Sequence, residues 1–246
     1  MEIEIELETE RFKNIVKAVS INGIIETPTL QFQPNQLKAI NKDLASVVLS
    51  YSIFKSKYFI KYGVETDYAV GFESQRLLRI AKQLSGEVAT IRLNSDKDEI
   101  EIFTKSREVA VPTVESVIKR AEIPSFVKEG ENGVETDASF MMSEKIQILK
   151  RELESLGELE TTFMLSNGEL SVKQESVDGY RDIQKLKNGI ACTDFSVISA
   201  TSYLSTIFDS VICEEVELKL SKDFPIVVLD KTADYNILLV LAPKVE

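Results

Sequence analysis

The stretch Glu215-Val-Glu-Leu-Lys-Leu-Ser221, followed by Asp223-Phe-Pro-Ile-Val-Val228, decides the fold class of the chain. Apolar and charged residues alternate in the first segment, which is typical of a half-buried strand, and Ile226–Leu229 is a short apolar run. The same patterns recur upstream. Further strands are predicted over Glu2–Leu7, Leu44–Tyr51, Glu87–Asn94, Glu99–Thr104, Thr161–Leu165 and Glu169–Gln174, with hairpin turns at Asn167-Gly168 and Asn94–Asp98.

Segments with helical spacing interrupt the strands at matching places in the two halves of the chain. They are predicted over Thr9–Ser20, Phe72–Leu84, Ser143–Leu156 and Asp194–Phe208. The order strand, helix, several strands, helix, several strands thus occurs twice, which predicts an α+β chain with two similar domains. We predict a first domain over 1–113, a connector without sustained period over 114–134, and a second domain over 135–246.

Composition argues against conventional enzyme chemistry. The 246 residues include 40 Asp and Glu, 29 Lys and Arg, and no His, so the formal net charge is −11. Without His, the commonest general acid–base group and the imidazole metal ligand are missing. Cys192 and Cys213 form no CxxC pair, so we expect neither a metal nor a cofactor. No apolar run approaches 18 residues and the first residues do not resemble a signal peptide, so we expect a soluble, intracellular protein.

Positive charge gathers on the helices although the chain is acidic. Arg11, Lys13 and Lys17 lie opposite or beside the apolar stripe of the first helix. The second helix has the same arrangement with Arg76, Arg79 and Lys82. The third helix has Lys145, Lys150 and Arg151, but also three glutamates, and the fourth has hydroxyl groups at Ser199, Ser202, Ser205 and Thr206 instead. An ordinary solvated helix face remains an alternative for each of them. Two similar basic faces in a repeated pattern favour a surface that contacts a polyanion.

The sequence contains no pattern for reading bases. It has no zinc finger, no recognition-helix motif and no glycine-rich phosphate loop. Lys and Arg along helix faces would instead contact phosphates of double-stranded DNA without regard to sequence, in a salt-dependent way.

The C-terminal residues resemble a known family. Tyr203-Leu204 lies in the predicted fourth helix, Pro225-Ile-Val-Val228 forms a strand, and the chain ends with Leu238-Leu-Val-Leu-Ala-Pro-Lys-Val245. This arrangement resembles sliding clamps of the proliferating cell nuclear antigen (PCNA) type, in which a similar strand precedes a terminal Leu-Ala-Pro-Lys segment. The resemblance covers the whole chain in pattern and is residue-specific mainly in the last third.

The resemblance implies a ring of three subunits around duplex DNA. Each subunit of this DNA clamp fold has two similar domains, with antiparallel sheets outside and two helices inside, so Glu2, Glu4 and Glu6 would face outward. Subunits would join edge to edge, through strands around Arg107–Val111 and Gly179–Ile183. Both a homotrimer and a heterotrimer remain open.

The resemblance also implies a docking pocket beneath the connector, where client proteins insert a short hydrophobic motif. The residues carried over by position are Ile40, Leu44, Ile123, Pro124, Pro225, Leu241, Ala242 and Pro243. Family members often have Tyr where this chain has Val240.

These features together suggest a DNA polymerase processivity clamp with no catalysis of its own. Its implied partners are DNA polymerase, flap endonuclease, DNA ligase and an ATP-driven clamp loader. It would be a cytoplasmic, nucleoid-associated protein of archaeal type, or nuclear in a eukaryote. Two alternatives remain. The first is a subunit of a heterotrimeric or checkpoint-type clamp in DNA repair signalling. The second is a carboxylate-based, metal-dependent nuclease that uses acids such as Asp96, Asp98 and Glu99.

Overall fold

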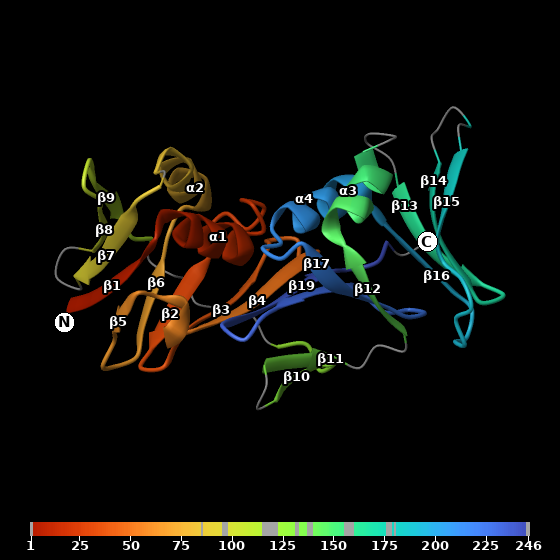
Figure 1. Ribbon diagram of the computed structural model, residues 1–246, viewed down its shortest axis with the longest axis horizontal. Helices are drawn as coiled ribbons and strands as arrows, with labels where there is room; N and C mark the ends of the chain where they lie inside the picture. The colour runs from red at the N-terminus through yellow and green to blue at the C-terminus, as the bar shows by residue number, and fades with distance from the viewer. Residues whose placement is uncertain are drawn as a thin grey trace.

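A computed structural model describes residues 2–84, 86–94, 98–114, 123–130, 133–136, 140–154, 160–175, 179 and 181–244. In this part of the chain four α-helices lie along one side of an elongated body, and antiparallel sheets form its other side and its two ends (Figure 1). The helices are α1 (Thr9–Ser20), α2 (Ser74–Gln83), α3 (Ile146–Glu154) and α4 (Thr201–Asp209).

One end of the body is a five-stranded sheet with the order β5-β1-β7-β8-β9. Its strands are β1 (Glu2–Glu8), β5 (Lys61–Gly63), β7 (Val88–Asn94), β8 (Glu99–Phe103) and β9 (Glu108–Pro112). As the alternation in the first strand predicts, Ile3, Ile5 and Leu7 are buried. On the opposite face Glu4 pairs with Lys61 of β5 and Arg92 of β7, and the hydrogen bond from Lys61 is the main cause that lowers the pKa of Glu4.

An eight-stranded sheet runs through the middle of the body and joins both halves of the chain. Its order is β12-β17-β18-β19-β4-β3-β2-β6. The strands are β2 (Thr29–Gln33), β3 (Gln36–Lys42), β4 (Val48–Lys55), β6 (Tyr68–Gly71), β12 (Phe140–Lys145), β17 (Glu215–Leu220), β18 (Ile226–Lys231) and β19 (Tyr235–Leu241). Strand β19 of the second half pairs with β4 of the first half from Tyr235 opposite Phe54 to Leu241 opposite Val48.

The remaining strands complete the second half and the connector. A four-stranded sheet has the order β15-β14-β13-β16, with β13 (Glu160–Ser166), β14 (Glu169–Glu175), β15 (Arg181–Lys187) and β16 (Phe195–Ala200). A hairpin of β10 (Val127–Gly130) and β11 (Gly133–Thr136) lies on the side of the eight-stranded sheet away from the helices (Figure 1). The turn at Asn167-Gly168 is a hairpin turn as predicted, with φ of 51° and 75° at its two residues. The other predicted turn contains residues 95–97, which lie outside the described part.

The first predicted helix is confirmed at both ends, and the others are shorter than expected. The helix predicted from Asp194 begins only at Thr201, because Phe195–Ala200 is strand β16 and pairs with β13. The helix predicted from Ser143 begins at Ile146, because the preceding residues belong to β12 and pair with β17. Its predicted end at Leu156 lies outside the described residues.

The strand predicted over Leu44–Tyr51 is displaced toward the C-terminus. Strand β4 begins at Val48, and residues 43–47 form a loop. The carboxylate of Asp43 closes this loop by accepting hydrogen bonds from the backbone N–H groups of Val47 at 2.7 Å and Val48 at 2.9 Å. Leu44 therefore lies at the loop tip with 95% of its surface exposed.

The main core lies between the helices and the inner faces of the sheets. The apolar stripes predicted on the helices are buried there, including Phe12, Val16, Leu77, Leu204 and Phe208. The predicted fourth helix places Ala200 on its inward face and Ser199 on the opposite face, and both placements are wrong. Ser199 is buried and Ala200 is exposed, because both belong to strand β16, where side chains alternate every residue rather than follow a helical period. Thus Ser199 is not part of a surface row of hydroxyl groups.

Candidate nucleic-acid interface and docking pocket

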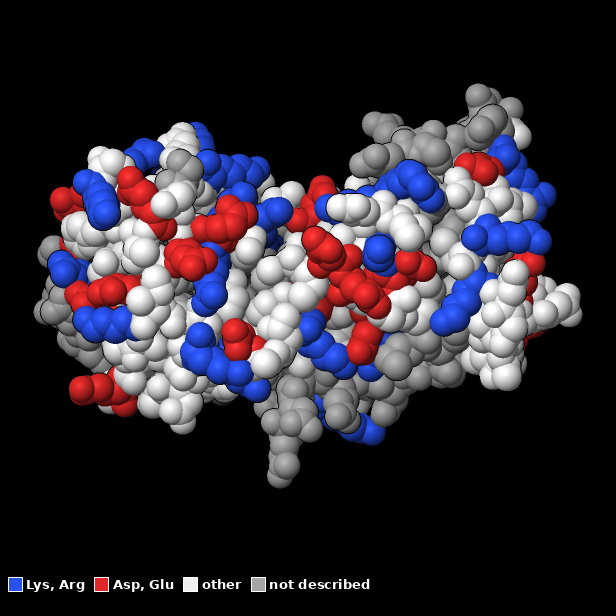
Figure 2. Space-filling view, in the orientation of Figure 1, with Lys and Arg blue, Asp and Glu red and all other residues white. Residues whose placement is uncertain are grey.

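The predicted cations lie on helices that share one side of the molecule. Helix α1 packs against α2, helix α3 packs against α4, and all of these helices follow the upper side of the body in Figure 1. Figure 2 shows Lys and Arg clustered over α1 and α2 at the upper left, with Asp and Glu interspersed and more frequent toward the centre. The separation of charge by side is therefore partial, since the helix side also carries acidic residues.

Helix α2 presents the most available cations. Its buried face contains Leu77 and Ile80, which leaves Arg76, Arg79 and Lys82 exposed. The Nε atom of Arg76 lies 3.3 Å from a carboxylate oxygen of Glu73. Within the described residues, Arg79 and Lys82 form no ion pair, so their charges are open to a phosphate ligand.

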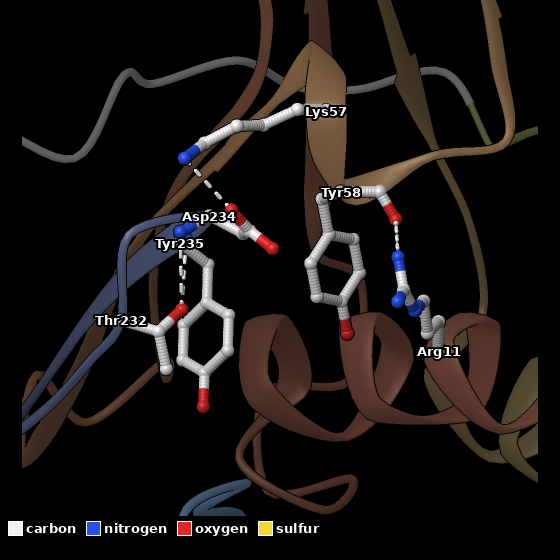
Figure 3. A network of polar contacts seen from close by, with 6 residues as sticks. All are labelled: Arg11, Lys57, Tyr58, Thr232, Asp234 and Tyr235. Carbon is white, nitrogen blue, oxygen red and sulfur yellow. Dashed lines mark hydrogen bonds and ion pairs between the residues drawn. The ribbon is translucent and has the colours of Figure 1, made fainter.

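Arg11 on α1 is engaged inside the molecule (Figure 3). Its Nη1 donates to the backbone carbonyl of Tyr58 at 2.5 Å, and its guanidinium lies over the Tyr58 ring, 5.2 Å from the ring centre. Its Nε atom also lies 3.5 Å from a carboxylate oxygen of Glu8. Arg11 therefore fastens α1 to the short 3-10 helix η1 (Ser56–Tyr58).

The same network reaches the second half of the chain. Lys57 of η1 pairs with Asp234 at 2.8 Å, and Asp234 stands in the turn that joins β18 to β19. The hydrogen bond from Lys57 is the main cause that lowers the pKa of Asp234. The rings of Tyr58 and Tyr235 meet edge to face with their centres 5.7 Å apart. Arg11 thus belongs to a cluster at the seam between the halves.

A test of Arg11 follows from these contacts. We expect Arg11→Ala to lower the free energy of unfolding by about 1.5–3 kcal/mol, since a buried carbonyl loses a charged donor. The control Lys13→Ala removes an equal charge whose partner, Glu10, is exposed, so its effect is expected below about 1 kcal/mol. Urea unfolding of both variants measures the difference. Equal stabilities would contradict the structural role of Arg11.

Lys17 and Lys150 bring cations of the two halves together. Lys17 is partly buried, and burial is the first cause that lowers its pKa, followed by the charge of Lys13. The charge of Lys150 on α3 lowers this pKa further, and that of Asp209 on α4 raises it. Asp209 pairs with Lys150 at 2.8 Å. The centre of the helix side therefore holds three lysines with partial compensation by acids.

The outer part of the second half has fewer cations on its helices. Lys145 and Arg151 are exposed, at the end of β12 and on α3. Helix α4 has no basic residue; Ser202, Ser205 and Thr206 remain at least partly exposed, and the Thr206 hydroxyl donates to the Ser202 carbonyl at 2.9 Å. Phosphate contacts from α4 would thus be made by hydroxyl groups alone.

A hollow of about 360 Å³ opens between the loop before β4, the connector and the last strand. Its lining is mostly apolar. It consists of Lys42, Ser46, Val47, Val48, Leu49, Pro124, Phe126, Pro225, Val240, Ala242 and Pro243. The N–H of Ala242 donates to the carbonyl of Val47 at 2.8 Å, which holds the C-terminal segment against the loop. A pocket of this size and lining suits apolar side chains of a partner.

Half of the pocket residues expected from sequence line this hollow. Pro124, Pro225, Ala242 and Pro243 do so, but Ile40, Leu44, Ile123 and Leu241 do not. Leu241 is 1% exposed and points into the main core, because side chains alternate along β19 and Val240 takes the pocket side. Ile40 packs in a second apolar cluster on the outer face of the sheet, with Leu49, Tyr51 and Val127. Leu44 is at the exposed loop tip, and Ile123 is 36% exposed just before the pocket wall.

Solved structures share this arrangement of elements over the whole chain. PCNA of A. fulgidus, solved with the C-terminal region of FEN-1 bound, has a TM-score of 0.82 at 13% identity, with 99% of each chain covered. The PCNA2–PCNA3 complex of Sulfolobus tokodaii has a TM-score of 0.80 at 17% identity, with 100% of each chain covered. PCNA of Thermococcus kodakaraensis has a TM-score of 0.80 at 19% identity, covering 98% of this chain and 100% of that one.

The chain has the sliding-clamp fold. The sequence itself matches no protein-family model and no curated protein. At identities of 13 to 19% the likeness establishes the fold, and the function must be argued from the residues of this chain.

Two outermost strands of this clamp fold lie at opposite ends of the body (Figure 1). Strand β9 is at the edge of the five-stranded sheet and β15 at the edge of the four-stranded sheet. They overlap the segments expected as edges from sequence, at Glu108–Val111 and at Arg181–Ile183, and Tyr180 lies outside the described residues. On β15 Arg181, Ile183 and Lys185 lie on one exposed face, and Ile183 is 44% exposed. The register with β14 shifts between Lys185 and Lys187.

The described residues give the nuclease alternative no site. Among them no three acidic or cysteine side chains converge as ligands of a metal ion. Asp98 and Glu99 lie at a turn and a strand start, and Asp96 lies outside the described part. Among the described residues no helix is both long enough and apolar enough to cross a membrane.

Proposed function

We propose that the chain is a DNA sliding clamp, a processivity factor that encircles duplex DNA as a three-subunit ring and tethers replication and repair enzymes. The observation that carries this proposal is the sliding-clamp fold with open cations on the helix side, above all Arg79 and Lys82 of α2. Such cations attract phosphates without reading sequence, and contacts of this kind permit movement along the duplex. The proposed role is a scaffold, not catalysis.

Ring formation would use the edge strands β9 and β15 of neighbouring subunits. Unpaired edges expose backbone donors and acceptors, and a head-to-tail contact that closes at three satisfies every edge. Charge supports this pairing, because the exposed face beside β9 carries Glu99, Glu101 and Glu108, whereas one exposed face of β15 carries Arg181 and Lys185. In this proposal the domains keep the boundaries 1–113 and 135–246, with 114–134 as the connector.

Clients would dock in the apolar hollow beneath the connector. The A. fulgidus PCNA structure contains the C-terminal region of FEN-1, so a protein of this fold binds a terminal segment of an endonuclease. We extend this to DNA polymerase, flap endonuclease, DNA ligase and a clamp loader, each through a short hydrophobic motif. Two weak contacts, one to the ring and one to DNA, then act together as one persistent attachment. The protein would act where the DNA is, in an archaeal-type cytoplasm or in a nucleus.

A second candidate is a subunit of a heterotrimeric clamp, including one that acts in repair signalling. The Sulfolobus tokodaii structure is a complex of two different PCNA chains, so unlike chains of this fold do assemble. Helix α4 without a basic residue favours this candidate, because partner subunits could supply the missing charge to the channel.

Native mass spectrometry tests the ring. We expect a mass three times the 27.6 kDa of the chain, or a three-chain complex after mixing with paralogues from the same genome. Ile183→Asp places a charge on the exposed face of β15 and is expected to leave only single chains. Ile60→Asp is the matched control, because Ile60 is also exposed but belongs to neither edge. A monomeric wild-type chain under both conditions would exclude the ring.

A further inference from the structure

The outer face of β2, β3 and β4 is basic in a protein whose net charge is −11. These strands contain Lys38, Lys42 and Lys55 and no Asp or Glu. Because side chains alternate along a strand, all three lysines share the face that points away from the helices, while Leu37 and Ala39 point into the main core. We call this surface, made by β3 and β4, the outer basic face.

Cations and apolar side chains lie next to each other on this face. The strand register sets Lys42 opposite Leu49, Ile40 opposite Tyr51, and Lys38 opposite Ile53. The ammonium of Lys38 lies over the Tyr51 ring, 5.2 Å from its centre. Leu49 and Tyr51 belong to the apolar cluster that also contains Val127 of the connector hairpin. Tyr51 is fully buried, so the apolar side chains that remain partly exposed beside the lysines are Ile40 and Ile53.

This face is continuous with the proposed docking pocket. Lys42 and Leu49 line the hollow, and Lys42 is the single charged residue among its described lining residues. The nearest acid in sequence is Asp43, whose carboxylate is occupied by the N–H groups of Val47 and Val48. Asp234, which lies beside Lys55, is paired with Lys57. Within the described residues Lys42 forms no ion pair, so its charge faces whatever enters the pocket.

We propose that the docking site selects segments in which an apolar anchor is flanked by acidic residues. The anchor fills the hollow, and the acidic flank crosses the outer basic face toward Lys38. The alternation of apolar and cationic positions fits a peptide better than a nucleic acid, because a duplex presents rows of phosphates without apolar side chains between them. This inference rests on the proposed docking function and adds the charge of the partner to it.

Two synthetic, fluorescently labelled peptides test the selection. Both carry the same anchor of aliphatic and aromatic residues, and the flank is a run of glutamates in one peptide and of glutamines in the other. We expect the acidic peptide to bind the intact chain more tightly, by about threefold to fivefold for each exposed ion pair formed. Raising the salt from about 0.05 to about 0.5 M should abolish most of this preference, since it screens exposed charges.

Variants assign the preference to particular lysines. Lys38→Gln with Lys42→Gln is expected to reduce the ratio of the two affinities to about one, and Lys38→Glu with Lys42→Glu to invert it. Because Lys42 also lines the hollow, the readout is the ratio of the two affinities rather than the affinity for either peptide alone. Lys105→Gln is the matched control, because Lys105 is exposed in the loop after β8, away from β3 and β4, and its loss should leave the ratio unchanged.

The outcomes separate this inference from the function on which it rests. Equal binding of both peptides by the intact chain would overturn the selection and leave the docking site in place. Binding of neither peptide would overturn the docking site itself. Displacement of the acidic peptide by short duplex DNA, reduced in the Lys38 and Lys42 variants, would assign the outer basic face to nucleic acid and also overturn the proposal.

Discussion

Replacing Arg76, Arg79 and Lys82 together by alanine is expected to weaken DNA binding by about tenfold to a hundredfold at moderate salt. The reason is that these side chains are exposed on α2 and that Arg79 and Lys82, among the described residues, have no acidic partner to lose. The slope of log affinity against log salt should become shallower by about one unit for each phosphate contact removed. Binding to a short duplex, measured by fluorescence anisotropy at several salt concentrations, gives both quantities.

The control for this variant removes equal charge from another surface. Lys128, Lys219 and Lys222 changed to alanine leave the helices and the edge strands β9 and β15 intact, so DNA affinity should change less than about threefold. The α2 variant should assemble with the same number of subunits as the intact protein, as measured by native mass spectrometry, because none of its three residues lies on β9 or β15. If the α2 variant binds DNA as the intact protein does, its cations are only solvated and the helix side is not the DNA interface.

Ala242→Asp is expected to abolish the docking of hydrophobic motifs, with a loss of at least about a hundredfold in affinity. The new carboxylate would stand in an apolar hollow of about 360 Å³, where an apolar partner would strip it of water without offering a hydrogen bond. Calorimetric titration with a peptide of aliphatic and aromatic residues measures the loss. Val88→Asp makes the same kind of change at an exposed site of β7 outside the hollow and should bind normally.

Leu44→Ser provides a second comparison at the pocket. Sequence alone places Leu44 among the pocket residues, but its side chain is 95% exposed at the loop tip and does not line the hollow. We therefore expect this change to cost less than about tenfold in peptide affinity. A loss as large as that of Ala242→Asp would show that the loop closes over the bound motif. Normal binding by Ala242→Asp would contradict the pocket assignment.

Local periodicity predicts those parts of the fold that depend on one segment at a time. Helix α1 is predicted at its observed ends, and the alternation Ile3, Ile5, Leu7 gives the buried face of β1. Strand β16 escapes prediction because Val197 and Ala200 fit a helical spacing with Leu204 of α4, which follows directly. Only pairing with β13, some thirty residues earlier in the chain, makes these residues a strand, and such pairing leaves no local pattern.

The candidate site shows the same limit. Helical periodicity correctly places Arg11 beside the apolar stripe of the first helix. It does not show that the Arg11 guanidinium donates a hydrogen bond to the carbonyl of Tyr58, 47 residues away. The positions carried over from the family resemblance correctly assign Pro124, Pro225, Ala242 and Pro243 to the pocket, but they wrongly assign Leu241. Strand alternation could have corrected that assignment, since a buried Leu241 requires Val240 on the other face. Val47 and Phe126 carry no such signal, because both stand in loops whose course depends on distant contacts.

The hydrogen bonding of β19 to β4 has a mechanical consequence. Seven consecutive residues of the C-terminal strand pair with the first half, so the middle of each chain is a continuous β structure rather than a hinge. A ring built from such chains would be rigid within each subunit, and it would open at an interface between two subunits. A clamp loader that opens such a ring would therefore separate two subunits at their interface. A fragment containing only one half of the chain would leave β4 or β19 without its strand partner.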